Sequence, residues 1–153
     1  MGLYINPLFI WRIKNKGRIL DGIAVLERMS PEEKEKVPYL EKVSSWECVL
    51  EEVIDTDHKP EYYARFAKTL FERGYTKEDI QEMRIIAWET AGWFNYEMMA
   101  WDWVHLSEED MLIGLENRKK KFGIMPWRYK RIKQKIEYYK NAHGSEQGVR
   151  GNG

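Results

Sequence analysis

The sequence predicts an all-α fold, a single-domain bundle of about six or seven helices with short loops. Apolar residues recur at helical spacing along most of the chain, and residues that cap helices precede several of these segments. No series of alternating strand-like segments competes with them. With 153 residues, seven tryptophans and nine tyrosines, the chain can bury a core without disulfide bonds.

The first expected helix covers residues 6–17, with Asn6 as its cap and Gly17 as its end, although a strand over residues 8–13 is an alternative. Ser30 and Glu33 form a capping box at the start of a second helix. From residue 38 to residue 54 the apolar positions follow a helical period, which predicts a third helix with one buried face.

The second half of the chain has similar residues that mark the starts and ends of helices. We expect a helix over residues 60–73, and another after Thr76, whose hydroxyl pairs with Asp79 in a capping box. Three more helices are expected over residues 95–106, from Ser107 to near Gly123, and from Pro126 onwards. As domains, we expect one helical domain over residues 1–143, containing a basic terminal helical unit at 118–141, and a flexible tail at 144–153.

Charge is strongly segregated although the net charge is zero. Residues 19–116 hold 23 acidic and 10 basic residues, a balance of −13. Residues 118–153 carry 11 basic and 2 acidic residues, a balance of +9, and residues 1–18 carry four basic residues and no acid. Such asymmetry indicates charged partners and has little bearing on the fold.

The composition favours a cytoplasmic protein. Cys48 is the single cysteine, so no intramolecular disulfide can form and a reducing compartment is the simpler interpretation. The amino terminus has an apolar stretch of only about seven residues, followed by its positive charges, which fits neither a signal peptide nor a membrane span.

The segment "NYEMMAWDWVHLSEED", residues 95–110, is apolar around most of a helical wheel. A central core helix is the favoured interpretation, because apolar residues at this spacing are usually buried. In the alternative, Trp101 or Trp103 stays exposed with a methionine as an anchor for a partner protein.

Several motifs between residues 45 and 118 resemble an uncharacterised family of small helical bacterial proteins, which has the layout D-T-E, G-W-N and E-W-x-G-F-D-E-E-W-L. The matching positions are Asp55, Thr56, Asp57, Gly92, Trp93, Asn95, Asp102, Trp103, Leu106, Glu108 and Glu109. The chain departs from the layout at His105, which replaces a glycine, and by one extra residue between Gly92 and Asn95. The resemblance implies a helical fold and no particular chemistry.

The sequence predicts no enzyme, no metal site and no cofactor. Asp102 and His105 supply only two ligands, whereas zinc takes three or four. Asp55, Asp57 and His58 are better explained as a turn before the next helix. No phosphate-binding loop, nucleophile elbow or zinc-protease motif is present in the sequence.

The basic carboxy-terminal segment allows two interpretations. A stripe of Ile132, Ile136 and Tyr139 would dock the last helix on the bundle. That leaves five cations expected to be largely exposed: Arg128, Lys130, Arg131, Lys133 and Lys135. They would either bind phosphates or pair with the acidic middle of the same chain.

Two functions follow as hypotheses, with a metal-dependent enzyme third. The favoured one is a non-enzymatic inhibitor or immunity-type protein that covers a basic toxin or nuclease with an acidic helical surface. Its expected contact residues are Glu97, Asp102, Trp103, Glu108, Glu109 and Asp110. The alternative is a nucleic-acid-associated protein, with expected contacts at Arg128, Lys130, Arg131 and Lys135.

Overall fold

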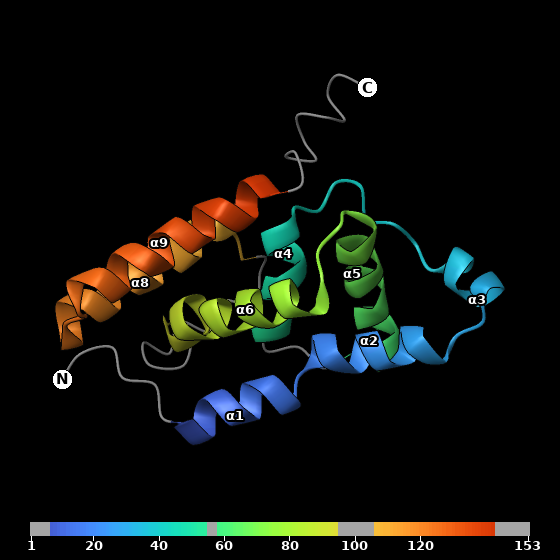
Figure 1. Ribbon diagram of the computed structural model, residues 1–153, viewed down its shortest axis with the longest axis horizontal. Coiled ribbons are helices and arrows are strands. Elements are labelled where there is room, and N and C mark those ends of the chain that lie inside the picture. The colour runs from blue at the N-terminus through green and yellow to red at the C-terminus, as the bar shows by residue number, and fades with distance from the viewer. Residues whose placement is uncertain (1–6, 55–57, 95–105, 143–153) are drawn as a thin grey trace.

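In the computed structural model, residues 7–54, 58–94 and 106–142 are described, and every regular element among them is helical (Figure 1). The prediction of an all-α single-domain bundle is confirmed. The elements are α1 (Pro7–Asn15), α2 (Arg18–Arg28), α3 (Pro31–Lys36), α4 (Ser45–Leu50), the 3₁₀ segment η1 (Glu51–Val53), α5 (Pro60–Glu72), α6 (Lys77–Ala87), the π-helical segment η2 (Trp88–Gly92), α8 (Glu108–Phe122) and α9 (Pro126–Asn141).

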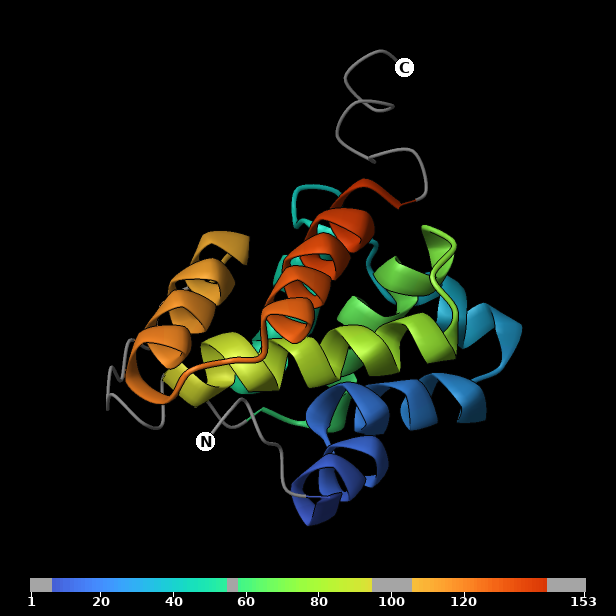
Figure 2. The ribbon, with the colours of Figure 1, turned by 60° about the vertical axis from the view of Figure 1, so that its left-hand side comes forward.

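Helix α6 runs through the middle of the molecule, with α1 and α2 on one side and α9 on the other (Figure 2). Helices α2 and α5 form the closest pair, because Gly22 lets the two backbones meet. A Cβ at Gly22 would lie 2.5 Å from the carbonyl carbon of Tyr63. Helix α8 approaches η2 in the same way, since a Cβ at Gly114 would lie 2.5 Å from the carbonyl oxygen of Thr90.

The predicted inner stripe of α9 is confirmed: Ile132, Ile136 and Tyr139 are buried in the core. Two hydrogen bonds reinforce this docking. Trp46 Nε1 on α4 donates to the Ile136 carbonyl at 2.9 Å, and the Tyr75 hydroxyl donates to the Tyr139 carbonyl at 2.6 Å. The second bond satisfies a carbonyl in the last turn of α9, where helical carbonyls lack intrahelical donors.

The structure corrects the helix expected over residues 38–54. Helix α4 starts only at Ser45, because Ser44 and Glu47 form a capping box in which Glu47 accepts from the Ser44 N–H at 2.8 Å. The preceding residues are held in a non-helical path by Arg73 of the α5 C-terminus. Its guanidinium donates to the Tyr39 hydroxyl, to the Ser45 hydroxyl and to the Leu40 carbonyl at 3.0 to 3.1 Å.

Other local expectations have mixed outcomes. The capping boxes at Ser30 and at Thr76 are confirmed, and the strand alternative over residues 8–13 is wrong because α1 spans all of it. At Ser107 the carboxylate of Asp110 accepts from the Ser107 N–H at 2.7 Å.

Helix α2 was not expected from the sequence, because Gly17 indicated the end of a helix and no capping residue after it indicated the start of another. The helix expected over residues 95–106 lies almost entirely outside the described residues.

Candidate functional site

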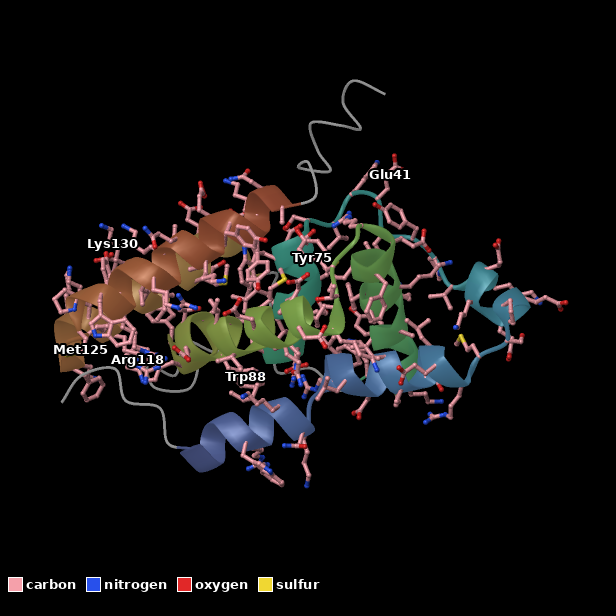
Figure 3. All side chains as sticks on the ribbon, in the orientation of Figure 1. Glu41, Tyr75, Trp88, Arg118, Met125 and Lys130 are labelled. Carbon is pink, nitrogen blue, oxygen red and sulfur yellow. The ribbon has the colours of Figure 1, made fainter. Side chains whose placement is uncertain are left out.

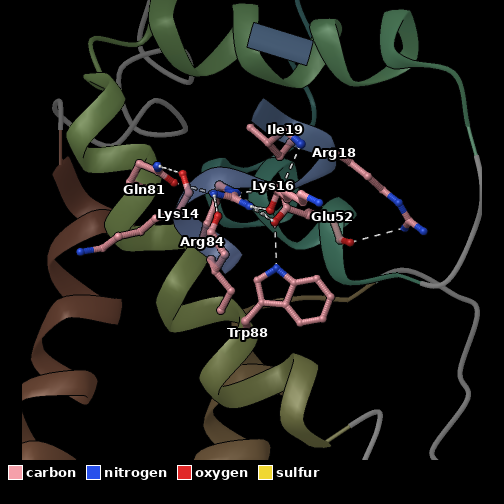
Figure 4. A network of polar contacts seen from close by, with 9 residues as sticks. Lys14, Lys16, Arg18, Ile19, Glu52, Gln81, Arg84 and Trp88 are labelled. Carbon is pink, nitrogen blue, oxygen red and sulfur yellow. Dashed lines mark hydrogen bonds and ion pairs between the residues drawn. The ribbon is translucent and has the colours of Figure 1, made fainter. Parts of the chain in front are cut away.

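The ion pair between Glu52 of η1 and Arg84 of α6 is the most buried of the described ion pairs (Figure 4). Their side chains are 2% and 0% exposed, and Arg84 Nε donates to both carboxylate oxygens of Glu52 at 2.8 and 2.9 Å. The same carboxylate accepts from the Ile19 N–H at 2.9 Å and from Trp88 Nε1 at 2.8 Å. Glu52 therefore caps the start of α2 from a distant part of the sequence.

The remaining donors of Arg84 hold the junction between α1 and α2. They reach the carbonyls of Ile13 at 2.5 Å and Lys16 at 3.0 Å, and the amide oxygen of Gln81 at 2.5 Å. Because both charged groups are saturated by contacts within the fold, this network is best explained as structural.

A second buried carboxylate, Glu89 in η2, ties α9 to the bundle. Its side chain is 4% exposed, and Nη2 of Arg128 contacts both carboxylate oxygens at 2.9 Å. Burial raises the pKa of Glu89, and the opposing charges of Arg128 and Arg118 offset part of that rise. The Arg118 guanidinium also donates to the Glu89 carbonyl at 2.8 Å.

Two further ion pairs follow the same helix. Lys135 lies 3.1 Å from Glu82 of α6, and Lys140 lies 3.3 Å from Glu108 of α8. The Tyr139 hydroxyl also donates to Glu82. Burial by itself would raise the pKa of Glu82, but the hydrogen bonds from Tyr139 and Lys135 and the Lys135 charge bring that pKa below its ordinary value.

These pairs correct part of the expected exposure of α9. Arg128 and Lys135 are half-buried and paired with acidic residues, so the expectation that both are largely exposed is wrong. Lys130, Arg131 and Lys133 are exposed, as expected. The basic segment therefore pairs partly within the chain and keeps other charges on the outside.

The outward charges lie among exposed aromatic and apolar side chains at the ends of α8 and α9. Of the six exposed large hydrophobic residues in the described part, Phe122, Met125 and Trp127 lie around the junction of α8 and α9, and Tyr138 lies near the other end of α9, so most of them belong to this helix pair and are not scattered evenly over the surface. We call the region the basic aromatic surface and define it as Lys119, Lys120, Lys121, Phe122, Met125, Trp127, Lys130, Arg131, Lys133 and Tyr138. Figure 3 shows Lys130 pointing away from the bundle and Met125 at the end where the two helices meet.

Contacts around Tyr129 join the α8 and α9 parts of this surface. The ammonium of Lys119 lies 4.1 Å from the centre of the Tyr129 ring, and that of Lys133 lies 5.3 Å from it. The Tyr129 hydroxyl donates to Glu116 of α8. The one acidic residue in the sequence between positions 119 and 138 is Glu137, so the charge of the surface is strongly positive.

The expected acidic contact residues are not gathered into a comparable surface in the described part of the chain. Glu97, Asp102 and Trp103 lie outside the described residues. Glu108 is paired with Lys140, and Asp110 is bonded to the Ser107 N–H at the start of α8. Glu109 is exposed.

The described residues contain no group of three or more histidine, cysteine or carboxylate side chains that could hold a metal ion. His58 is exposed and stacks on Tyr62, with ring centres 3.9 Å apart. Its expected companions Asp55 and Asp57, and also Asp102 and His105, lie outside the described residues. Among the described helices, none has the length and apolar character needed to cross a membrane.

No protein-family model, curated protein or solved structure matches this chain. The resemblance to a family of small bacterial proteins stays a prediction, and most of its motif positions lie outside the described residues.

Sequence reasoning identified the charges of the terminal helix and the aromatic residues among them, but it did not predict which of these aromatic residues are exposed. Trp127 and Tyr138 are 60% and 59% exposed. A signal was present, since both lie on the opposite side of the helical wheel from Ile132 and Ile136. For Glu89 the sequence has no comparable signal, because no pattern near residue 89 predicts that its carboxylate pairs with Arg128.

Proposed function

We propose that this protein is a non-enzymatic binding protein that binds nucleic acid through its basic aromatic surface. The observation that carries the proposal is a group of six exposed cations beside exposed aromatic rings, with one acidic residue in the same stretch of sequence. Phosphate groups bind such cations and release counterions, which supplies affinity independent of base sequence.

The ion pairs within the fold divide the cations of this segment into those that face a carboxylate and those that do not. Arg128, Lys135 and Lys140 pair with Glu89, Glu82 and Glu108. The six cations of the surface have no carboxylate partner within ion-pair distance among the described residues: Lys119, Lys120, Lys121, Lys130, Arg131 and Lys133. The nucleic-acid contacts expected from the sequence are Arg128, Lys130, Arg131 and Lys135. We omit Arg128 and Lys135 from them because both are paired, and we add Lys119, Lys120, Lys121 and Lys133.

The inhibitor hypothesis, with a basic toxin or nuclease as its target, has less support. Of its six expected residues, only Glu109 is a described, exposed side chain without a described ion pair. A cytoplasmic location stays part of the proposal and agrees with the presence of a single cysteine, the buried Cys48, which has no second cysteine for an intramolecular disulfide.

The test compares two triple variants that remove the same charge. One changes Lys130, Arg131 and Lys133 to glutamine, and the matched control changes three exposed lysines elsewhere: Lys36, Lys42 and Lys59. Affinity for an oligonucleotide of about 20 nucleotides, longer than most single-domain sites, is measured between roughly 50 and 200 mM salt.

The first variant should weaken binding and reduce the slope of log affinity against log salt by about 1 for each lost phosphate contact. The control should keep the slope of the original protein. Absence of binding at low salt, or equal losses in both variants, would overturn the proposal.

A further inference from the structure

The outer side of α9 carries a straight row of side chains that includes two aromatic rings and an amide as well as a positive charge. Trp127, Arg131, Gln134 and Tyr138 stand at helical spacings of four, three and four residues, and all are exposed. These spacings place them in one line along the helix. The row lies on the opposite side of α9 from the buried stripe that docks the helix. The Tyr138 ring meets the Tyr139 ring edge to face, with ring centres 5.0 Å apart, and the Lys135 ammonium lies 5.4 Å from the centre of the Tyr138 ring.

The two rings are separated by a distance that suits a short nucleic-acid strand. Eleven residues of helix at 1.5 Å each place Trp127 and Tyr138 about 16 Å apart. A strand rises about 3.4 Å per nucleotide in a stacked form, so the row spans about five nucleotides. Arg131 lies between the rings, and Lys130 lies beside the row.

Bases in a duplex already stack on their neighbours, and their faces are not available to side chains. Unpaired bases expose these faces and stack on aromatic rings with little dependence on sequence. Cations alone would bind the phosphates of a single strand and of a duplex equally well. The exposed aromatic rings are therefore the feature that favours a single strand over a duplex.

We propose that this row binds single-stranded nucleic acid, with bases stacked on Trp127 and Tyr138 and phosphates held by Arg131 and Lys130. This inference rests on the proposed function and adds the class of ligand. Beside Tyr138, a shallow depression lined by Gln134, Glu137 and Asn141 adds amide and carboxylate groups that can bind the edge of a stacked base.

The test uses the full chain and the substitutions Trp127→Ala and Tyr138→Ala, singly and together. The matched control is Trp11→Ala, because Trp11 on α1 is 59% exposed and lies outside the surface. The probes are a single-stranded oligonucleotide, the duplex of the same length, an abasic strand of the same length and polyglutamate. Circular dichroism melting checks that each variant folds like the original.

Each substitution in the row should weaken binding of the single strand by roughly 5-fold to 150-fold and leave duplex and abasic binding nearly unchanged. Trp11→Ala should change none of them. Equal weakening for the three nucleic acids, or no weakening for the single strand, would overturn the stacking while leaving charge-based binding in place.

Two other outcomes separate this inference from the proposed function. If the original protein binds no nucleic acid probe, both fail together. If polyglutamate binds more tightly than every nucleic acid, an acidic protein segment is the better partner for the row, and both proposals are wrong.

Discussion

Gly17 is a single residue whose lack of a side chain allows the buried network to form. It lies between α1 and α2, against the guanidinium of Arg84. A Cβ there would overlap that guanidinium and lie 2.8 Å from a carboxylate oxygen of Glu52. Gly17 has an extended backbone that any residue can adopt, so the constraint comes from the neighbouring side chains and not from its dihedral angles.

We predict that Gly17→Ala destabilises the protein by about 1 to 3 kcal/mol, the usual cost of an overpacked site. Arg84 cannot swing aside cheaply, because its donors already hold the carbonyls of Ile13 and Lys16. Urea unfolding followed by circular dichroism measures the change. Lys16→Ala is the control, since its side chain is exposed and its backbone carbonyl is kept. Equal stability of the two variants would contradict the tight contact.

The contact between Arg128 and Glu89, at 2.9 Å, is the shortest described ion pair between helix α9 and the rest of the bundle. We predict that Arg128→Met costs about 1 to 3 kcal/mol at neutral pH, because a buried carboxylate loses its charged donor. The lower part of this range is expected, since the Arg128 side chain is 30% exposed. Arg131→Met, on the outer side of the same helix, should cost much less.

The pH dependence of this variant provides a second readout. Without Arg128, burial raises the pKa of Glu89 further above its unfolded value of about 4.5. The folded state then gains stability below that unfolded pKa and loses it as pH rises through the folded pKa. The deficit of Arg128→Met should therefore shrink as the pH is lowered towards 4.5 in urea titrations. A deficit independent of pH would show that Glu89 does not cause the loss.

Elements with local start signals were predictable, and elements fixed by distant residues were not. Capping boxes mark the starts of α3 and α6, and each consists of two residues within one helical turn: Ser30 with Glu33, and Thr76 with Asp79. Helix α2 has no such signal, because its capping carboxylate is Glu52, which lies 33 residues from Ile19 in the sequence.

The same limit applies to the candidate site. The buried stripe of α9 and the exposed Lys130 follow from helical periodicity. The pairing of Lys135 with Glu82 required the path of α6, which no pattern near residue 135 reveals. Sequence reasoning therefore found the charges, and the fold decided which of them face outward.

At the scale of the whole molecule, the segregated charges meet along one side of α9. Three of its cations pair with carboxylates from α6, η2 and α8, and the others remain at the surface. Two tyrosines, Tyr129 and Tyr139, add hydrogen bonds to Glu116 and Glu82 on the same side. Acid should weaken this association, because protonated carboxylates no longer attract the lysines and arginines.

Glu82 allows a direct test of that effect on global stability. Its folded pKa lies below the ordinary value of 4.5, so its contribution is present above 4.5 and is lost as pH falls through the lowered pKa. We predict that the unfolding free energy of the original protein falls between about pH 5 and pH 3, and that Glu82→Gln removes part of this fall. At neutral pH the variant should be less stable, since Lys135 loses its charged partner.

The measurement is a set of urea unfolding curves across that pH range, with Glu137→Gln as the control. Glu137 is an exposed carboxylate on α9, so its replacement should leave the pH profile close to the original. The opposing contribution of Glu89, whose pKa is raised, is common to all three proteins and cancels in their differences. If the profiles of Glu82→Gln and the original protein run parallel, the pairing of Glu82 with Lys135 and Tyr139 does not hold α9 in place, and docking depends on the apolar stripe alone.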